Sequence, residues 1–149
     1  MDCIMCKQIE TIMDDPFTAI ELKTGYAAFR YAQRFKGYTL FICKQHATEL
    51  HQLAHEFKMK HLEEMSIVAQ AVHNVFHADK MNYELLGNAV EHIHWHIIPR
   101  KYGELPENQP IWRLSREELD DLSTAPPPDE LRDMVERLKA EIQRLLHAK

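Results

Sequence analysis

The chain has 149 residues, of which 45% are hydrophobic and 28% are charged, a composition typical of one soluble globular domain. Its 18 basic and 23 acidic side chains leave a formal net charge of −5, which argues against a protein that coats polymeric nucleic acid. No apolar run approaches the roughly 20 residues that span a bilayer, and the first residues lack the pattern of a signal peptide. A cytoplasmic protein without a membrane partner is therefore expected.

Local patterns predict four strands and two long helices. Aromatic and β-branched stretches indicate the strands, and apolar residues that recur every three or four positions indicate the helices. In chain order these are strands at 26–29 and 38–43, a helix at 55–77, strands at 81–86 and 92–99, and a helix at 129–147. The polar, proline-punctuated stretch 100–128 is predicted to be mostly loop, with a short helix at 115–122.

The simplest architecture for this order is α+β, with one antiparallel sheet on which the long helix and the C-terminal helix pack. We expect a single domain over 1–149, with its core at roughly 3–100 and the C-terminal loop and helix at 101–149.

Apolar stripes predict the buried face of each long helix. The stripe of the first helix is Leu62, Met65, Val68 or Ala69, Val72, Val75 and Phe76, and that of the last is Leu131, Met134 or Val135, Leu138, Ile142 and Leu145. Asp129 is expected to cap the last helix. Ser115 and Glu118 have the spacing of a capping box for the short helix. Trp112, in the loop, is expected to be a buried anchor rather than part of a lid.

The strongest functional signal is a strict alternation of histidine with apolar residues, namely His92, Ile93, His94, Trp95, His96 and Ile97. Alternate side chains of a strand point to one face, so the imidazoles are expected in a row, about 6.5–7 Å apart. The apolar side chains would bury the opposite face. A merely polar surface is disfavoured, because three histidines in register oppose a fully apolar face.

Two kinds of chemistry suit such a row. His-x-His on a strand suits a catalytic metal, because imidazole is a common zinc ligand. Alternatively, one neutral imidazole is a nucleophile while its neighbours orient it or donate protons. Glu91 is close in sequence but is expected on the face opposite to the histidines, which disfavours the metal.

The row and its surroundings resemble the histidine-triad (HIT) superfamily, in particular its bacterial-type hydrolases and the diadenosine polyphosphate hydrolases. The triad with its hydrophobic spacers carries the resemblance, together with the segments 38–46, 82–88 and 99–100, so that it covers roughly residues 3–100. It implies a nucleotide hydrolase or nucleotidyl transferase that acts at the α-phosphate through a nucleotidyl-histidine intermediate. The implied substrates are dinucleoside polyphosphates or nucleoside phosphoramidates, and a homodimer is implied as well.

The resemblance also implies roles for single residues. His94 would attack the α-phosphorus, and His96 would bind the phosphate and help to protonate the leaving group. Asn88 would contact phosphate, helped by the backbone N–H of Ala89, where many relatives have a hydroxyl side chain. Asn82 is a further candidate for a phosphate or sugar contact.

The Cys3-x-x-Cys6 pair admits several interpretations. On its own it is a redox pair or two small residues in a terminal turn. Its resemblance to zinc-binding members implies a structural Zn²⁺ held by Cys3, Cys6, His46 and His92, with no catalytic metal. The alternative is a pair of free thiols. Cys43 is expected to be packed rather than reactive, and three cysteines do not indicate a disulfide framework.

Arg30 marks a departure from the relatives that bind purine nucleosides, which usually have a ribose-binding aspartate at this position. The stretch 25–37 contains no carboxylate. Arg30 would either contact extra phosphates of a longer substrate, because guanidinium suits phosphate oxygens, or belong to a solvated charged strand. Phe29, Tyr31 and Phe35 are candidates for a base pocket, although aromatic residues on strands more often belong to the core.

Three functions are therefore weighed. The first is a hydrolase of nucleotide phosphoanhydride or phosphoramidate bonds. The second is a nucleotide-binding module with little turnover, which the missing aspartate and the missing hydroxyl favour. The third is a zinc-dependent hydrolase that uses the triad as ligands. Each has a nucleotide, rather than a polymeric nucleic acid, as its partner.

Overall fold

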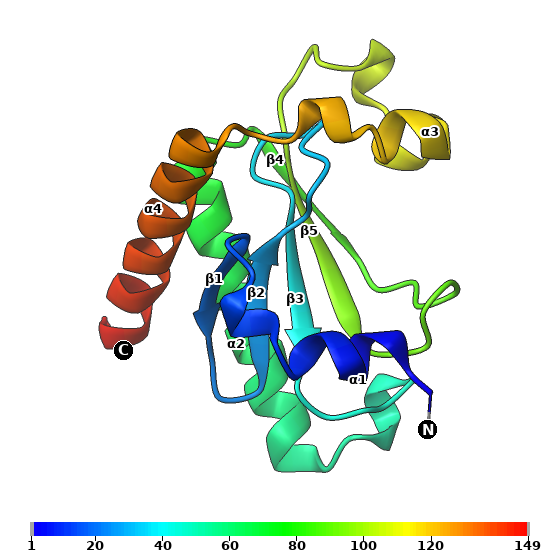
Figure 1. Ribbon diagram of the computed structural model, residues 1–149, viewed down its shortest axis with the longest axis vertical. Helices are drawn as coiled ribbons and strands as arrows, with labels where there is room; N and C mark the ends of the chain where they lie inside the picture. Colours follow the sequence, from blue (N-terminus) through cyan, green and yellow to red (C-terminus); the bar gives the residue numbers. More distant parts are fainter. Residues whose placement is uncertain (1, 149) are drawn as a thin grey trace.

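The computed structural model describes residues 2–148, and within them five strands form one antiparallel sheet in the order β1-β2-β3-β5-β4. The strands are β1 (Thr18–Glu21), β2 (Gly25–Phe29), β3 (Thr39–Cys43), β4 (Lys80–Glu84) and β5 (His94–Arg100). The histidine strand β5 lies between β3 and β4 (Figure 1). Hydrogen bonds on both sides therefore fix its register and decide which side chains share a face.

Four α-helices accompany the sheet in the described part of the chain: α1 (Ile4–Ile9), α2 (His55–Phe76), α3 (Arg116–Leu119) and α4 (Pro128–His147). Short 3-10 turns lie at Ile12–Asp14, Leu50–Gln52, Pro106–Asn108, Ile111–Arg113 and Leu122–Thr124. Across residues 2–148, no helix combines the length and the apolar character that crossing a bilayer requires.

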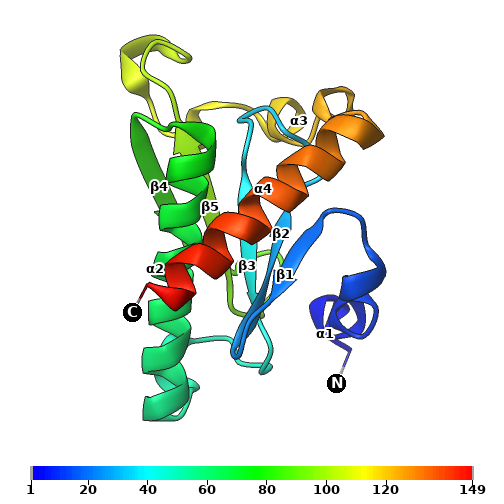
Figure 2. The same cartoon turned by 90° about the vertical axis from the view of Figure 1, so that its left-hand side faces the viewer.

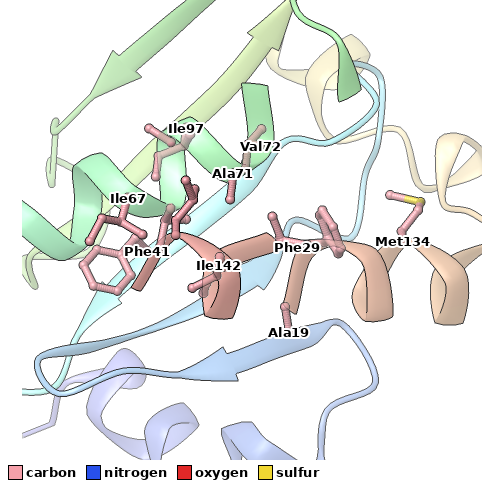
Figure 3. Packing of buried hydrophobic residues seen from close by; sticks show 14 of the residues in the cluster. Ala19, Phe29, Phe41, Ile67, Ala71, Val72, Ile97, Met134 and Ile142 are labelled. Atoms are coloured by element: carbon pink, nitrogen blue, oxygen red, sulfur yellow. The ribbon is translucent and has the colours of Figure 1, made fainter. Parts of the chain in front are cut away.

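Helices α2 and α4 cover one face of the sheet, with α4 crossing α2 (Figure 2). The main core fills the space between these layers, where Phe41 and Ile97 of the sheet pack with Val72 of α2 and Ile142 of α4 (Figure 3). All four side chains are fully buried, and each such burial stabilises the fold by about 1.5–3 kcal/mol. The opposite face is only partly covered, by α1 at one end (Figure 1).

Gly37 allows the end of α2 to approach the turn between β2 and β3. Its φ of +97° is readily adopted only by glycine, and a Cβ at this position would lie 2.6 Å from the ring of Phe76. Phe76 can therefore pack against this turn only because residue 37 has no side chain.

The predicted α+β class is confirmed, and so is most of the element order. The capping box of the short helix is present: the Glu118 N–H donates to Ser115 Oγ (3.1 Å), and the Ser115 N–H donates to Glu118 Oε2 (2.8 Å). Strand β1 and helix α1 were not predicted. Each is too short, at four and six residues, to show a clear period.

Two helix predictions need correction, although Val68, Ala69, Val72 and Val75 of α2 are buried as predicted. In α2, Leu62, Met65 and Phe76 are only partly buried, whereas Ile67 and Ala71 are buried. The reason is that α2 packs against both the sheet and α4, so its buried face is wider than one stripe. Asp129 is not the cap of the last helix. This helix begins at Pro128, with proline at its first position and no side-chain cap.

Candidate active site and metal site

The predicted alternation is confirmed for His94, Trp95 and His96, whereas His92 lies just before β5 rather than within it. His94 and His96 lie on the partly covered face with their ring centroids 5.1 Å apart, while Ile93 and Ile97 are buried among apolar side chains. Across the strand, Ile42 of β3 pairs with His94 and Leu40 pairs with His96. The two imidazoles therefore stand side by side next to an apolar strip of β3.

The nearby backbone fixes the tautomer of His94. Its Nδ1 lies 2.6 Å from the carbonyl oxygen of His92. A carbonyl oxygen can only accept a hydrogen bond, so Nδ1 must carry the proton. In the neutral ring, Nε2 then keeps its lone pair, which is the form that a nucleophile requires.

His96 presents the complementary group. Its Nδ1 lies 2.7 Å from the hydroxyl oxygen of Tyr38. Burial raises the pKa of Tyr38, so this phenol keeps its proton, and burial, assisted by His94 and Arg30, lowers the pKa of His96 to about 4. Nδ1 of His96 is the only hydrogen-bond partner recorded for the Tyr38 hydroxyl within residues 2–148. Because buried hydroxyls rarely leave their proton unpaired, Tyr38 donates to Nδ1 and His96 carries its proton on Nε2.

The four predicted metal ligands come together at the N-terminal end of the histidine row. The ligand atoms of Cys3, Cys6, His46 and His92 all lie within 4.8 Å of one another. Cys6 Sγ is 3.4 Å from Nδ1 of His46 and 3.5 Å from Nδ1 of His92, and Cys3 Sγ is 3.6 Å from the same atom of His92. Tetrahedral zinc with ordinary Zn–S and Zn–N bonds places its sulfur and nitrogen ligands about 3.5 Å apart. The cluster is therefore able to hold a metal ion.

A backbone contact orients His92 toward this cluster. Its Nε2 lies 2.7 Å from the carbonyl oxygen of Cys43, which can only accept, so Nε2 carries the proton and Nδ1 is left for a metal. Hydrogen bonds from the second ring nitrogen to a carbonyl are the usual support of metal-binding histidines. Cys43 itself is fully buried, in agreement with the prediction that it is packed.

One pocket is lined by a histidine of the row, and two others are lined by residues next to the row. One of about 250 Å³ lies over β2 and β3 and is lined by apolar Ala28, Leu40 and Ile42, with Phe29, Arg30 and Tyr31 also in its wall. One of about 330 Å³ is lined by His96, Tyr38, Glu84 and residues of the C-terminal segment. The third, of about 440 Å³, lies beside Cys3 and His46 and includes Asn88 and Ala89.

The predicted substrate-binding residues lie in separate parts of the structure and have different partners. Asn88 and Ala89 lie in an exposed loop beside the metal cluster. Asn82 accepts a hydrogen bond from Arg100 Nη1 (2.9 Å). Arg30 donates to the Leu119 carbonyl (3.0 Å), forms an ion pair with Asp120 and lies 5.0 Å over the Tyr38 ring.

Several residues of the site were not predicted or were predicted wrongly. Tyr38 and Glu84 lie in segments that carry the family resemblance, but neither was assigned a role, and Glu84 faces His96 only through the pairing of β4 with β5. Trp112 is 66% exposed at the rim of the His96 pocket, so its prediction as a buried anchor was wrong. Of the suggested aromatic lining, Phe29 and Tyr31 line the β2–β3 pocket, whereas Phe35 belongs to a separate core cluster.

A buried polar chain lies on the other face of β5. The Trp95 Nε1–H donates to Nε2 of His61 on α2 (3.2 Å), His61 Nδ1 is 3.1 Å from Thr24 Oγ1, and the Thr24 hydroxyl donates to Glu64 (2.5 Å). His61, Thr24 and Glu64 are each at most 3% exposed. The burial of His61 was not predicted, because nothing in the sequence distinguishes a buried histidine from an exposed one on this helix.

The burial of His61 predicts a loss of stability in acid. Burial lowers the pKa of His61 to about 4, against about 6.5 in an unfolded chain, so the unfolded state binds the proton more tightly. The stabilisation is complete above about pH 6.5 and is lost as the pH falls toward 4. We expect this group alone to reduce the free energy of unfolding by about 2 kcal/mol at pH 5. Urea unfolding at pH 7 and pH 5 measures the difference. In His61→Gln the difference in unfolding free energy between pH 7 and pH 5 should be smaller. A difference as large as in the wild type would contradict the role of His61 in the acid sensitivity.

Comparison with known proteins places these features in a family context. The family model described as HIT domain matches residues 17–103. An adenosine 5'-monophosphoramidase of Schizosaccharomyces pombe is 32% identical over 130 residues, covering 80% of this chain and 91% of that protein. An adenosine 5'-monophosphoramidase of Saccharomyces cerevisiae is 29% identical over 100 residues, and this match covers 66% of the present chain but only 63% of the yeast protein.

Solved structures give the same relationship. A histidine triad protein from Bradyrhizobium japonicum superposes with a TM-score of 0.74 at 22% identity, covering 88% of this chain and 93% of that one. A zinc-bound histidine triad family protein from Mycobacterium smegmatis superposes with a TM-score of 0.66 at 25% identity, covering 100% and 99% of the two chains.

Proposed function

Since this chain belongs to the HIT domain family, we propose that it is a nucleotide hydrolase that cleaves a phosphoramidate or phosphoanhydride bond at the α-phosphate. The observation that carries the proposal is the pairing of a free imidazole lone pair on His94 with an N–H on His96, whose ring centroids are 5.1 Å apart. The activity named for the two yeast relatives supports a phosphoramidate as the first substrate to test.

In the proposed first step, Nε2 of His94 attacks the α-phosphorus. A bond forms between this nitrogen and phosphorus while the bond from phosphorus to the leaving amine breaks, and its electron pair stays on the amine nitrogen. The Nδ1–H bond to the His92 carbonyl stabilises the positive charge that develops on the ring. The result is a nucleotidyl-histidine, which divides one difficult displacement into two easier ones.

His96 supplies the proton that the leaving amine needs. Its pKa of about 4 in the free site rises when the negative substrate lies beside it, so the bound complex takes up a proton. Nδ1 takes up this proton, and Nε2 then passes its own proton to the amine. In the second step, water attacks phosphorus, its hydroxyl stays on the nucleotide, its other proton returns to His96, and His94 is released. The Tyr38 hydroxyl can donate or accept, so it supports both forms of His96.

The surroundings suggest where the substrate lies. The apolar pocket over β2 and β3 adjoins both histidines through Leu40 and Ile42, and its apolar floor suits a nucleoside. Arg30 lines both this pocket and the His96 pocket, a position from which a guanidinium contacts phosphate oxygens. We include Asn82, Asn88 and Ala89 as further substrate contacts on the basis of the family resemblance.

We also propose that Cys3, Cys6, His46 and His92 hold a structural zinc ion. The spacing of the ligand atoms and the zinc-bound relative from Mycobacterium smegmatis support it. When bound, the ion ties the N-terminal segment and the loop after β3 to the start of the histidine row. With four protein ligands the site would leave no open position for water or substrate, so the zinc it holds would be structural rather than catalytic. A cytoplasmic homodimer completes the proposal, again from the family resemblance.

The direct test is turnover of adenosine phosphoramidate and diadenosine tetraphosphate, measured before and shortly after addition of a chelator. We expect the protein to hydrolyse the phosphoramidate, and we expect this hydrolysis to continue after the chelator is added for as long as circular dichroism shows that the chain is folded. Loss of turnover with an unchanged fold would support the zinc-dependent hydrolase instead. Binding of either compound without turnover would support the nucleotide-binding module and overturn the proposal.

A further inference from the structure

Trp95 connects the reacting histidines to helix α2. It lies between His94 and His96 on β5, and its side chain points to the opposite face of the sheet, where the indole N–H donates to Nε2 of His61 (3.2 Å). His94, Trp95 and His96 are consecutive residues of one strand. A change in the position of the indole therefore shifts the strand that carries both imidazoles.

His61 is held from several directions. Its ring stacks on Phe41, the cross-strand partner of Trp95, with centroids 4.8 Å apart and planes inclined by 17°. Phe57, one turn earlier on α2, lies nearly parallel to it at 6.3 Å. The side chain is fully buried, so its two nitrogens depend on protein partners. These contacts leave the imidazole little freedom to rotate.

Glu64, at the far end of this series of hydrogen bonds, determines which atom donates in each of them. The carboxylate of Glu64 accepts from the Thr24 hydroxyl (2.5 Å), the Thr24 N–H (2.8 Å) and the Lys23 N–H (3.1 Å). Since the Thr24 hydroxyl proton points to Glu64, the Thr24 oxygen accepts from Nδ1–H of His61. Nε2 of His61 is then a pure acceptor, which is what the indole N–H requires.

We propose that His61 is a positioning residue: by holding Trp95, it sets the orientation in which His94 and His96 meet the substrate. The inference rests on the proposed function, because the positioned rings are those of the reaction. A purely structural role for the same hydrogen bonds makes a different prediction. It requires a loss of stability in variants of His61, without a specific effect on the chemical step.

Three variants separate these possibilities. His61→Met removes the acceptor at similar volume, Trp95→Phe removes the donor, and His61→Gln keeps an acceptor near the position of Nε2. We expect His61→Met and Trp95→Phe to lower kcat by about 10- to 100-fold with KM changed less than about twofold, because a shift of about 1 Å at reacting groups costs up to about 100-fold. His61→Gln should restore most of kcat. The double variant should fall little below either single one, because both act on one bond.

Val72→Ala is the matched control. Val72 is fully buried on the same helix, in the main core, and takes no part in the polar chain. This variant should lower the melting temperature while the folded protein keeps wild-type kcat. An equal fall in kcat for Val72→Ala and His61→Met, at temperatures where both are folded, would overturn the inference, as would unchanged kcat in His61→Met.

A spectroscopic readout does not depend on turnover. The chain has two tryptophans, so its ¹⁵N spectrum contains two indole signals, and Trp112→Phe assigns them. In His61→Met we expect the Trp95 indole signal and the ring signals of His94 and His96 to shift. Unchanged ring signals would overturn the positioning role even if the wild type turned over no substrate. Absence of turnover in the wild type would by itself refute the proposed function.

Discussion

Replacing His94 by alanine is expected to lower kcat/KM for adenosine phosphoramidate by about 10⁴-fold or more. The variant lacks the nitrogen that we propose attacks phosphorus, and the neighbouring His96 directs an N–H rather than a lone pair into the site. A measurable rate would have to come from direct attack of water. Because His94 is on the partly covered face and outside the main core, the fold should persist.

The measurement combines steady-state rates with trapping of the intermediate. Wild-type protein quenched in acid-free denaturant should carry one labelled nucleotide on His94, located by peptide mass spectrometry, and the variant should carry none. His147→Ala, at the exposed end of α4, is the matched control and should keep the wild-type rate. A His94→Ala protein that retains a tenth of the wild-type rate would show that another group attacks phosphorus.

Loss of the metal site should have the second largest effect. Cys6→Ser removes one of the four proposed ligands and is expected to abolish tight binding of about one equivalent of zinc. Because metal binding by such sites contributes directly to folding, we expect the melting temperature to fall by about 10 °C, which corresponds to a few kcal/mol for a domain of this size. The N-terminal segment should then become more accessible to protease.

Metal analysis and thermal melts with and without chelator test this expectation. Cys43→Ala is the control, because the Cys43 side chain is buried away from the cluster and only its carbonyl contacts His92. It should keep both the zinc and its response to chelator. Wild-type protein that is purified without metal, binds none on titration and melts unchanged in chelator would contradict a structural zinc site.

The histidine row was predictable because its signal is local. A period of two places His94 and His96 on one face whatever the rest of the chain does. The hydrogen bonds that select their tautomers were not predictable. The Tyr38 hydroxyl reaches His96 across 58 positions, and His61 reaches Trp95 across 34, so both depend on sheet register and helix packing.

The partner of Arg30 could not be predicted from the sequence either. The sequence suggested either a phosphate contact or a solvated charge, and the structure adds a partner that neither hypothesis contained, namely the ion pair with Asp120. This partner is 90 positions away, in a segment that was predicted mostly as loop. Composition and spacing carry no information on such a pairing.

The wall formed by residues 111–120 around His96 has an evolutionary consequence. It lies outside residues 17–103, which match the family model, whereas His94 and His96 lie inside them. This wall meets the part of the chain that matches the family model at Arg30, through Leu119 and Asp120. Under the proposed function, mutations in this wall reshape the mouth of the His96 pocket while the imidazole pair stays intact, so substrate preference can change independently of the chemical step.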